Sequence, residues 1–486
     1  MSFISSSFFF FSVIAILFIR FPSRIIDRHW RVLLLNIWFI SSYFQTLASF
    51  LPLLAFIILG YISLYSIAYL KKTTIATLCI AIVILVFAWV KQYAAIILLE
   101  QALGIEKFAF MSVGLSYILF RILHLIIDTH QSGSKAPGII KYINYCLFFP
   151  NFVSGPIQRY EDFNTQMSGP LLKFDTNTLH KAMCRFFQGI IMILVISALA
   201  DKLGTWCQSN YYSFASTEKL GLLTLLNLSA ASLLYLINIY ANFSGYMHIV
   251  IGVGLLAGFS IPENFNHPYL AKNFLDLWAR WHITLSEWFK LYLFNPVLKA
   301  MAQRWDSPSL SPYFGAFSFF VTFLVMGIWH GTSFMFVFYG LFLGLGAMLN
   351  KAWQVALADW IGKKPYKALT QRNWYFQISR ALTLSYFAIA LLCLWFEPSQ
   401  LAIIGKRYFL GQGALAFLFL TITIVLISIV IEILSIIIGR VKSCFPKTHI
   451  SADTSMIVGM TIRLFIIINV LGIAGGNAPE FIYKAF

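Results

Sequence analysis

The sequence predicts an all-α protein that crosses a membrane many times. Of its 486 residues, 59% are hydrophobic and only 11% are charged, a balance that water-soluble globular proteins do not show. Mean hydropathy is +0.79, and apolar runs recur along the whole chain. The formal net charge of +17 fits Lys and Arg in cytoplasmic loops and beside anionic lipid. No nucleic-acid-binding motif accompanies it, so we expect no nucleic-acid partner.

Apolar runs divide the chain into expected membrane spans. Residues 2–19 have no charge ahead of them and four arginines between positions 20 and 31 behind them. We therefore expect a retained span with an outward N-terminus rather than a cleaved signal peptide. The later runs are residues 32–70 (two passes), 75–90, 93–99, 108–127, 139–152, 184–200, 220–258, one ending at 350, then 375–396, 414–438 and 456–474. We expect about eleven spans plus re-entrant or interfacial helices, in a single domain over residues 1–486.

The connections between these runs carry their own signals. Residues 201–219 are predicted to form a polar loop. A basic loop that we expect in the cytoplasm holds Lys363, Lys364, Lys367 and Arg372. Close packing of helices is predicted by four glycines: Gly245, Gly252, Gly254 and Gly258.

Residues 274–292 show an amphipathic helical pattern. Aromatic and aliphatic residues recur at helical spacing, and charged residues such as Asp276, Arg280 and Glu287 occupy the other face. Such a helix is too charged to span a bilayer and is rich in Trp, so we expect it at the membrane interface. His282 follows Trp278 by four residues, which places it on the apolar, inward-facing side.

His330 lies in a run without other strongly ionisable side chains. Between Asp306 and Lys351 there is no Asp, Glu, Lys or Arg. An ionisable group in an apolar segment is costly, which favours a functional role over that of a packed interior histidine. Gly327 and Gly331 flank His330 and would let another backbone or a substrate approach closely.

Several kinds of site find no support in the sequence. The six cysteines are scattered without a C-x-x-C pair, and the H-x-x-x-H and H-E-x-x-H spacings are missing. We therefore predict neither a disulfide framework nor a metal site. The chain also has no G-x-S-x-G nucleophile elbow, which argues against a serine acyl-enzyme.

Four motifs occur in an order that resembles a known family. They are FFPNFVSGPIQRYEDF from residue 148, FSGYMHIVIGVGLLAGFSIPENFNHPYL from residue 243, RWHITLSEWF from residue 280 and GIWHGT from residue 327. Together with the ending APEFIYKAF, they resemble the membrane-bound O-acyltransferase (MBOAT) family, in its bacterial branch of alginate O-acetylation and teichoic-acid D-alanylation. The motif-rich core covers about residues 148–350.

The resemblance implies a ring of helices around a central chamber, with a thin partition and a funnel on each side. It implies that the acyl group crosses the membrane as it is transferred, and that SGPIQRY helps to build the chamber. His330 and His282 match the family's active-site residues. Residues of the surrounding motifs that would shape the chamber are Trp278, Arg280, Trp281, Trp329 and Gly331.

Acyl transfer suits a histidine on chemical grounds. A hydroxyl that attacks a thioester must lose its proton, and an imidazole with an ordinary pKa of about 6.5 is matched to accept it. We assign His330 as this general base. The tetrahedral oxyanion needs a hydrogen-bond donor, for which His282, Asn264, Asn266 and a backbone N–H all remain open.

The predicted reaction moves an acyl group, by preference acetyl, from a cytoplasmic thioester to a hydroxyl outside the cytoplasmic (inner) membrane. The donor would be acetyl-CoA or an acyl-carrier protein, with no tightly bound cofactor, and the acceptor a cell-envelope polysaccharide or a partner protein. D-alanyl transfer to teichoic acid is the alternative. Alginate-type relatives often carry acidic residues where this chain has Asn242 and His248, which favours that alternative. A transporter or flippase would also show broken spans, although inverted-repeat symmetry is not visible.

Overall fold

The computed structural model describes residues 5–22, 25–44, 46–104, 113–215 and 222–396, most of 415–430, and a few residues between 458 and 469. These residues form helices joined by loops. No β-strand occurs among them, and one isolated antiparallel bridge joins Phe265 and Trp281. The predicted all-α class is confirmed. The APEFIYKAF ending and most of the last expected span lie outside the described residues.

The first half of the described chain contains α1 (Ser6–Arg20), α2 (Arg28–Ser41), α3 (Leu47–Leu70), α4 (Thr73–Lys91), α5 (Ala94–Ala102), α6 (Leu115–Ser132), α7 (Ile139–Leu147), η1 (Phe149–Asn151), α8 (Tyr160–Ser168), α9 (Thr176–Ile191), η2 (Met192–Ser197) and α10 (Ala198–Ala215). The second half contains α11 (Leu222–Ala257), η3 (Pro268–Leu270), α12 (Phe274–Trp278), α13 (Ile283–Phe289), η4 (Lys290–Phe294), α14 (Asn295–Arg304), α15 (Ser311–His330), α16 (Phe334–Ile361), α17 (Lys363–Leu369) and α18 (Asn373–Trp395).

Seven of the described helical segments are long and apolar enough to cross a membrane, so the chain is a multi-pass membrane protein. They are Ala48–Leu70, Thr73–Lys91, Thr176–Tyr211, Leu223–Ala257, Ser311–His330, Phe334–Ile361 and Asn373–Trp395. The expected count of about eleven is not confirmed. Residues 32–70 hold two helices, of which only α3 has the length of a span, and the first expected span, α1, has 15 residues. Short pieces such as α5 and α7 fit the re-entrant elements that we expected.

The predicted polar loop at residues 201–219 is wrong over most of its length, because α10 continues to Ala215. Asp201 does not end the helix, since Asn238 of α11 donates a hydrogen bond of 2.9 Å to its carboxylate. Ser197 hydrogen-bonds to the side-chain oxygen of Asn238 at 2.6 Å. Such interhelical bonds satisfy polar groups between packed helices. The resulting segment of 36 residues is about 54 Å long and must tilt in a bilayer of about 30 Å.

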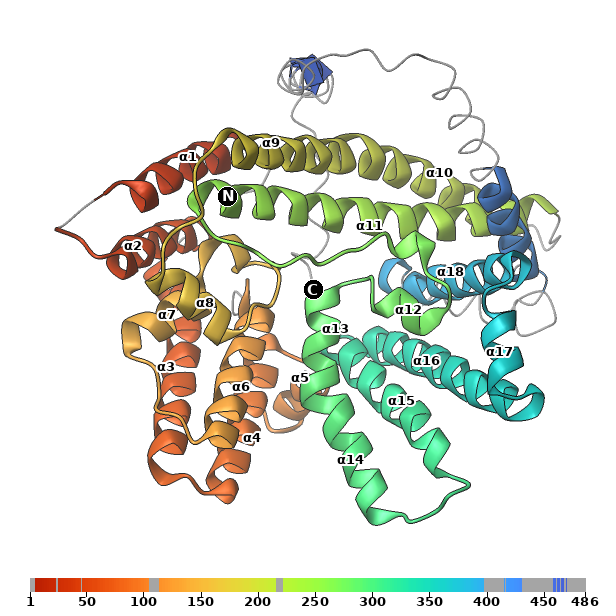
Figure 1. Ribbon diagram of the computed structural model, residues 1–486, viewed down its shortest axis with the longest axis horizontal. Helices are drawn as coiled ribbons and strands as arrows, with labels where there is room; N and C mark the ends of the chain where they lie inside the picture. The colour runs from red at the N-terminus through yellow and green to blue at the C-terminus, as the bar shows by residue number, and fades with distance from the viewer. Residues whose placement is uncertain are drawn as a thin grey trace.

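Three groups of helices organise the molecule (Figure 1). The segment α9–η2–α10 lies side by side with α11 along one edge. Helices α3, α4 and α6 pack together as a second group, and α14, α15 and α16 as a third. The predicted close packing at the α11 glycines is confirmed at Gly245, where an added Cβ would lie 2.9 Å from the carbonyl oxygen of Gly189 in α9. The basic segment predicted as a loop contains the short helix α17.

Helices α15 and α16 make the closest backbone approach near the candidate site. A Cβ added at Gly327 of α15 would overlap the Cα of Gly340 in α16, and one added at Gly331 would overlap the ring of Phe336. The prediction of close backbone approach at Gly327 is therefore confirmed. At Gly331 the space is occupied by this chain's own phenylalanine. The α15–α16 pair thus fixes the end of α15, which carries His330.

Replacing Gly327 by Ala should separate these helices. We expect Gly327→Ala to destabilise the protein by about 1–3 kcal/mol, because an inserted methyl group in a close-packed contact forces backbone shifts. Thermal unfolding of the purified protein in detergent measures the loss.

Gly315→Ala provides the matched control on the same helix. A Cβ at Gly315 would meet only the flexible end of Lys351, at 3.7 Å, so this change should raise stability slightly through better helix propensity. Equal melting temperatures for the two variants would contradict the close approach at Gly327.

Candidate active site

The segment that carries His282 is broken at that residue. Helix α12 ends at Trp278, α13 begins at Ile283, and His282 between them has the left-handed backbone angle φ 45°. The prediction of one amphipathic helix over residues 274–292 is therefore wrong. The backbone instead pairs with an earlier segment: Ile283 donates to the carbonyl of Asn264 at 3.0 Å, and Asn266 donates to that of Arg280 at 2.9 Å. These long-range bonds outweigh the helical periodicity.

Asn264 binds His282 and its neighbours from within the core. Its side-chain oxygen accepts hydrogen bonds from the backbone N–H of Thr284 (3.1 Å), from the Thr284 hydroxyl (3.0 Å) and from Nδ1 of His282 (3.3 Å). The Thr284 hydroxyl in turn accepts a bond of 3.0 Å from the N–H of Ile157, which belongs to the SGPIQRY motif. The SGPIQRY motif therefore contacts the segment that carries His282; its role in a reaction chamber stays a prediction.

The imidazole of His282 is held at both nitrogens. Because the amide oxygen of Asn264 can only accept, Nδ1 of His282 carries the proton, and Nε2 accepts from the Tyr117 hydroxyl at 3.2 Å. His282 is 1% exposed. Burial, and secondarily the neighbouring His330, hold the pKa of His282 well below its usual range. His282 is thus a neutral, fixed ring, on the inward side as the sequence predicts.

His330 lies at the end of α15 and is also buried, at 6% exposure. Its ring packs against that of Trp329, with centroids 4.8 Å apart, and near that of Tyr339 at 5.9 Å. The Trp329 ring makes an edge contact with Tyr117 at 5.8 Å. Tyr117 of α6 therefore touches both the His282 ring and the neighbour of His330, so the two predicted histidines belong to one cluster.

Lys91 adds a buried positive charge to this cluster. It ends α4, is 9% exposed, and donates a hydrogen bond of 3.0 Å to the hydroxyl of Ser116. Two residues later, the Tyr93 hydroxyl donates to the carbonyl oxygen of Trp329 at 3.4 Å, which places the end of α4 beside the end of α15. A cation buried among apolar helices is costly and points to function by default.

The other predicted site residues lie around the cluster rather than in it. Trp278 packs against Phe323 of α15, with ring centroids 4.8 Å apart. This contact fixes the end of α12 against α15. Arg280 binds Asp276, with Nε 3.1 Å from the carboxylate. Other residues from the prediction are placed as follows: Trp281 is buried beside Phe265, Asn266 is exposed and lines a polar cavity, and Gly331 packs under Phe336.

Two polar cavities reach the segment around His282. The larger, about 880 Å³, includes Ile283 and Asn266 and extends to Lys181 and Arg185 of α9. The smaller, about 260 Å³, includes Thr284 and Ile157 and continues along other residues: Gln158, Arg159, Glu287, Trp288, Lys290 and Tyr292. Adjacent residues of α13 therefore face different cavities, as in a partition with access from more than one direction. Within the described part of the chain, no three His, Cys, Asp or Glu side chains gather as metal ligands would.

Comparison with known proteins decides the family. The model of the membrane-bound O-acyltransferase family matches residues 35–397, which include the cluster of Tyr117, His282 and His330. The chain belongs to the MBOAT family. The match begins earlier than the motifs suggested and ends before APEFIYKAF.

Curated MBOAT relatives come from both bacterial branches that the motifs resemble. A probable alginate O-acetylase, AlgI of Pseudomonas aeruginosa, is 28% identical over 246 residues, which are 50% of this chain and 43% of the relative. A teichoic acid D-alanyltransferase of Bacillus subtilis is 28% identical over 269 residues, 54% of this chain and 63% of the relative. That of Streptococcus thermophilus is 27% identical over 244 residues, 50% of this chain and 57% of the relative. The chain spans about half the length of these relatives.

Sequence reasoning missed three members of this MBOAT cluster. Tyr117 and Ser116 lie in an apolar run that gives no periodic signal for them, and only the folded contact to His282 identifies Tyr117. Lys91 is visible in the sequence directly after the apolar run 75–90. A lysine at that position is typical of the boundary of a membrane span, so it did not indicate a site residue.

The low pKa of His282 gives stability a pH dependence. Below about pH 6.5 the unfolded chain binds a proton that the folded protein refuses, so stability falls as the pH falls, by up to about 1.4 kcal/mol per unit. We expect a lower melting temperature at pH 5.0 than at pH 7.5. The decrease should be smaller in His282→Asn, because an amide side chain does not titrate. Asn is chosen because it tolerates the left-handed backbone.

His267→Asn is the matched control. His267 has the same backbone angle, φ 45°, but its side chain is exposed. This variant should keep the wild-type decrease in melting temperature. If His282→Asn keeps it as well, burial of a neutral His282 is not a source of the pH dependence.

Proposed function

We propose that this protein is an O-acyltransferase of the cytoplasmic membrane. It takes an acyl group, by preference acetyl, from a cytoplasmic thioester and transfers it to a hydroxyl of an extracytoplasmic envelope polysaccharide or of a partner protein. The observation that carries the proposal is the buried cluster in which Tyr117 bridges His282 and the neighbour of His330, within the region that matches the family model.

His330 acts as the general base in this proposal. It removes the proton as the hydroxyl oxygen attacks the thioester carbonyl, and the resulting imidazolium protonates the thiolate that leaves when the C–S bond breaks. His282 is less suited to this role, because its basic nitrogen already accepts the Tyr117 hydroxyl and its other nitrogen donates to Asn264. His282 therefore orients the cluster.

The oxyanion would be stabilised by positive charge rather than by the asparagines. The Asn264 oxygen can only accept, its amide nitrogen is directed to the sulfur of Met247, and Asn266 is exposed rather than buried in the cluster. Lys91 is buried at the end of α4, where Tyr93 contacts the carbonyl of Trp329, the residue before His330. A fixed cation in a site without bulk water favours a developing negative charge strongly.

The larger polar cavity is suited to the acyl donor. Its lining includes Lys181 and Arg185 of α9, and Glu263, which pairs with Arg185, is the one acidic residue among its described lining residues. The excess of basic side chains suits the phosphates of CoA or an acidic carrier protein. Arg20 donates to the backbone of Leu256 at the end of α11, which adds a further cation near the same end of the helix pair. Excess Lys and Arg mark the cytoplasmic side of membrane proteins.

The smaller cavity is suited to the acceptor. Its lining combines the aromatic rings of Trp288 and Tyr292 with polar groups from Gln158, Arg159 and Glu287. Such a mixture fits a hydroxyl-rich sugar or polyol, whose apolar face packs on a ring while its hydroxyls form hydrogen bonds. The smaller cavity also reaches Thr284, whose hydroxyl donates to the same Asn264 oxygen that accepts from His282.

D-alanyl transfer to teichoic acid is the second candidate. Relatives of both kinds match with similar identity. At His248, where alginate-type relatives often carry an acid, the imidazole accepts from Arg185 at 2.9 Å, and Glu263 pairs with the same guanidinium. The acidic group beside Arg185 is thus supplied by Glu263, after the end of α11, and not by position 248.

Release of ester-linked groups from envelope polymers tests the proposal. Acetate and D-alanine, freed by mild base, are quantified separately from cells with wild-type protein, His330→Ala or no protein. We expect one of the two groups to fall in His330→Ala to the level without protein, since loss of a general base costs about 10²–10⁴-fold in rate. The group that falls identifies the donor class.

His130→Ala, a partly buried histidine elsewhere on α6, is the control and should retain full transfer. Membrane levels of each variant must match. An unchanged release of both groups in His330→Ala would reject His330 as the base, and unchanged release without the protein would favour the transporter alternative.

A further inference from the structure

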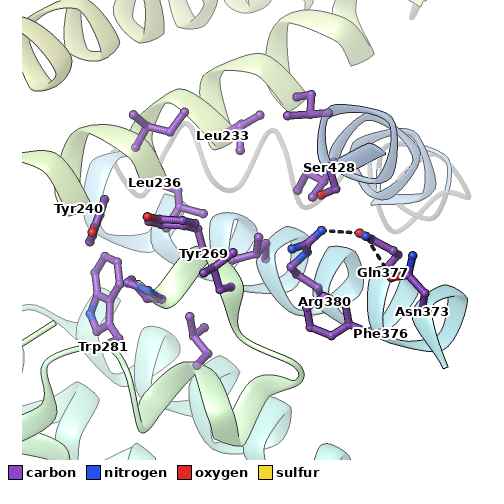
Figure 2. A pocket seen from close by; sticks show the side chains of 17 residues that line it. Leu233, Leu236, Tyr240, Tyr269, Trp281, Asn373, Phe376, Gln377, Arg380 and Ser428 are labelled. Carbon is purple, nitrogen blue, oxygen red and sulfur yellow. Dashed lines mark hydrogen bonds between the residues drawn. The ribbon is translucent and has the colours of Figure 1, made fainter. Parts of the chain in front are cut away.

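A third cavity, which shares Tyr240 with the larger polar one, lies between α11, α18 and the helix of residues 417–430 (Figure 2). Its volume of about 530 Å³ falls within the range of ligand sites, about 300–1,000 Å³. Both α11 and α18 are candidate membrane spans. The cavity is therefore placed where lipid, rather than a water-soluble molecule, is the most abundant ligand.

The walls of this cavity are largely apolar. Leu233, Leu236 and Ile237 come from α11, and Ile424 and Ile427 come from the helix of residues 417–430. One end is aromatic: Figure 2 shows Tyr240 and Trp281 together there, with Tyr269 beside them. The aliphatic part of this cavity accommodates a hydrocarbon chain, because apolar surface on both sides is then removed from water.

The opposite end is polar and positively charged. Figure 2 shows Arg380, Gln377 and Asn373 of α18 there, beside Ser428. Arg380 is 8% exposed, is hydrogen-bonded to Gln377, and lies over the ring of Phe376 at 4.8 Å. Among the seventeen described residues that line the cavity, Arg380 is the one Lys, Arg, Asp or Glu. The cavity therefore has a positive charge at one end and largely apolar walls along its length.

Further basic residues precede the polar end of the cavity along the chain. Helix α18 begins at Asn373, directly after the exposed Arg372, and α17 before it carries Lys363, Lys364 and Lys367. Basic residues beside a membrane span attract anionic lipid headgroups. A guanidinium held in place by neighbours also binds phosphate through paired, charge-assisted hydrogen bonds.

We propose that this cavity binds one anionic phospholipid. The headgroup phosphate lies at Arg380 and Ser428, and one acyl chain runs between the aliphatic residues of α11 and of residues 424–427 toward Trp281. The inference does not depend on the proposed acyl transfer. It assigns the cavity a resident lipid whose chain ends against the residue that precedes His282.

Lipid retention by the purified protein tests this site. The protein in detergent is titrated with phosphatidylglycerol or phosphatidylcholine, and bound lipids are counted by native mass spectrometry. We expect wild type to retain one phosphatidylglycerol with about 10-fold preference over phosphatidylcholine, a ratio typical of a charge-assisted contact. Arg380→Gln keeps the shape of the cavity and should abolish the preference.

Arg372→Gln, at the exposed start of α18, is the matched control and should keep the preference. Ser428→Phe fills the polar end while leaving Arg380 in place, so it should lower phosphatidylglycerol retention even if Arg380→Gln fails to accumulate. Equal retention of both lipids by wild type, or undiminished preference in Arg380→Gln, would show general surface lipid only and overturn the proposal. Undiminished retention in Ser428→Phe would overturn it as well.

Discussion

The side-chain oxygen of Asn264 accepts hydrogen bonds from Nδ1 of His282 and from the N–H and hydroxyl of Thr284. Asn264 is fully buried, so these bonds are not exchanged for water. They hold His282 in a left-handed conformation that is uncommon for residues other than glycine. The orientation of the ring toward Tyr117, and through it the relation to Trp329 and His330, depends on this one buried amide.

Three distant parts of the chain meet at the cluster, and each is rigid for its own reason. Tyr117 belongs to α6, a helix buried along most of its length. The segment with His282 is held by backbone pairing to residues 264–266. His330 ends α15, which is locked to α16 where Gly327 meets Gly340. A catalytic group needs such support, because small displacements weaken proton transfer greatly.

The sequence was sufficient to predict the membrane class and the family, because composition and short motifs are local properties. It also singled out His282 and His330, which the fold brings into one cluster. It failed where tertiary contacts overrode local pattern. The spacing around Trp278 and Leu285 fits a continuous helix, yet pairing with residues 264–266 breaks it at His282. Asp201 is typical of a loop, but Asn238 satisfies its carboxylate within a helix. Lys91 and Tyr117 could not be found, since their proximity to the histidines exists only after folding.

Tyr240 lines both the large polar cavity beside α9 and the apolar cavity beside α18. At this point the two spaces share an aromatic side chain. The ring of Tyr240, with its hydroxyl at one end and a hydrocarbon body, suits a boundary between a polar and an apolar space. A change in the rotamer of this one ring would therefore alter the walls of both cavities at once.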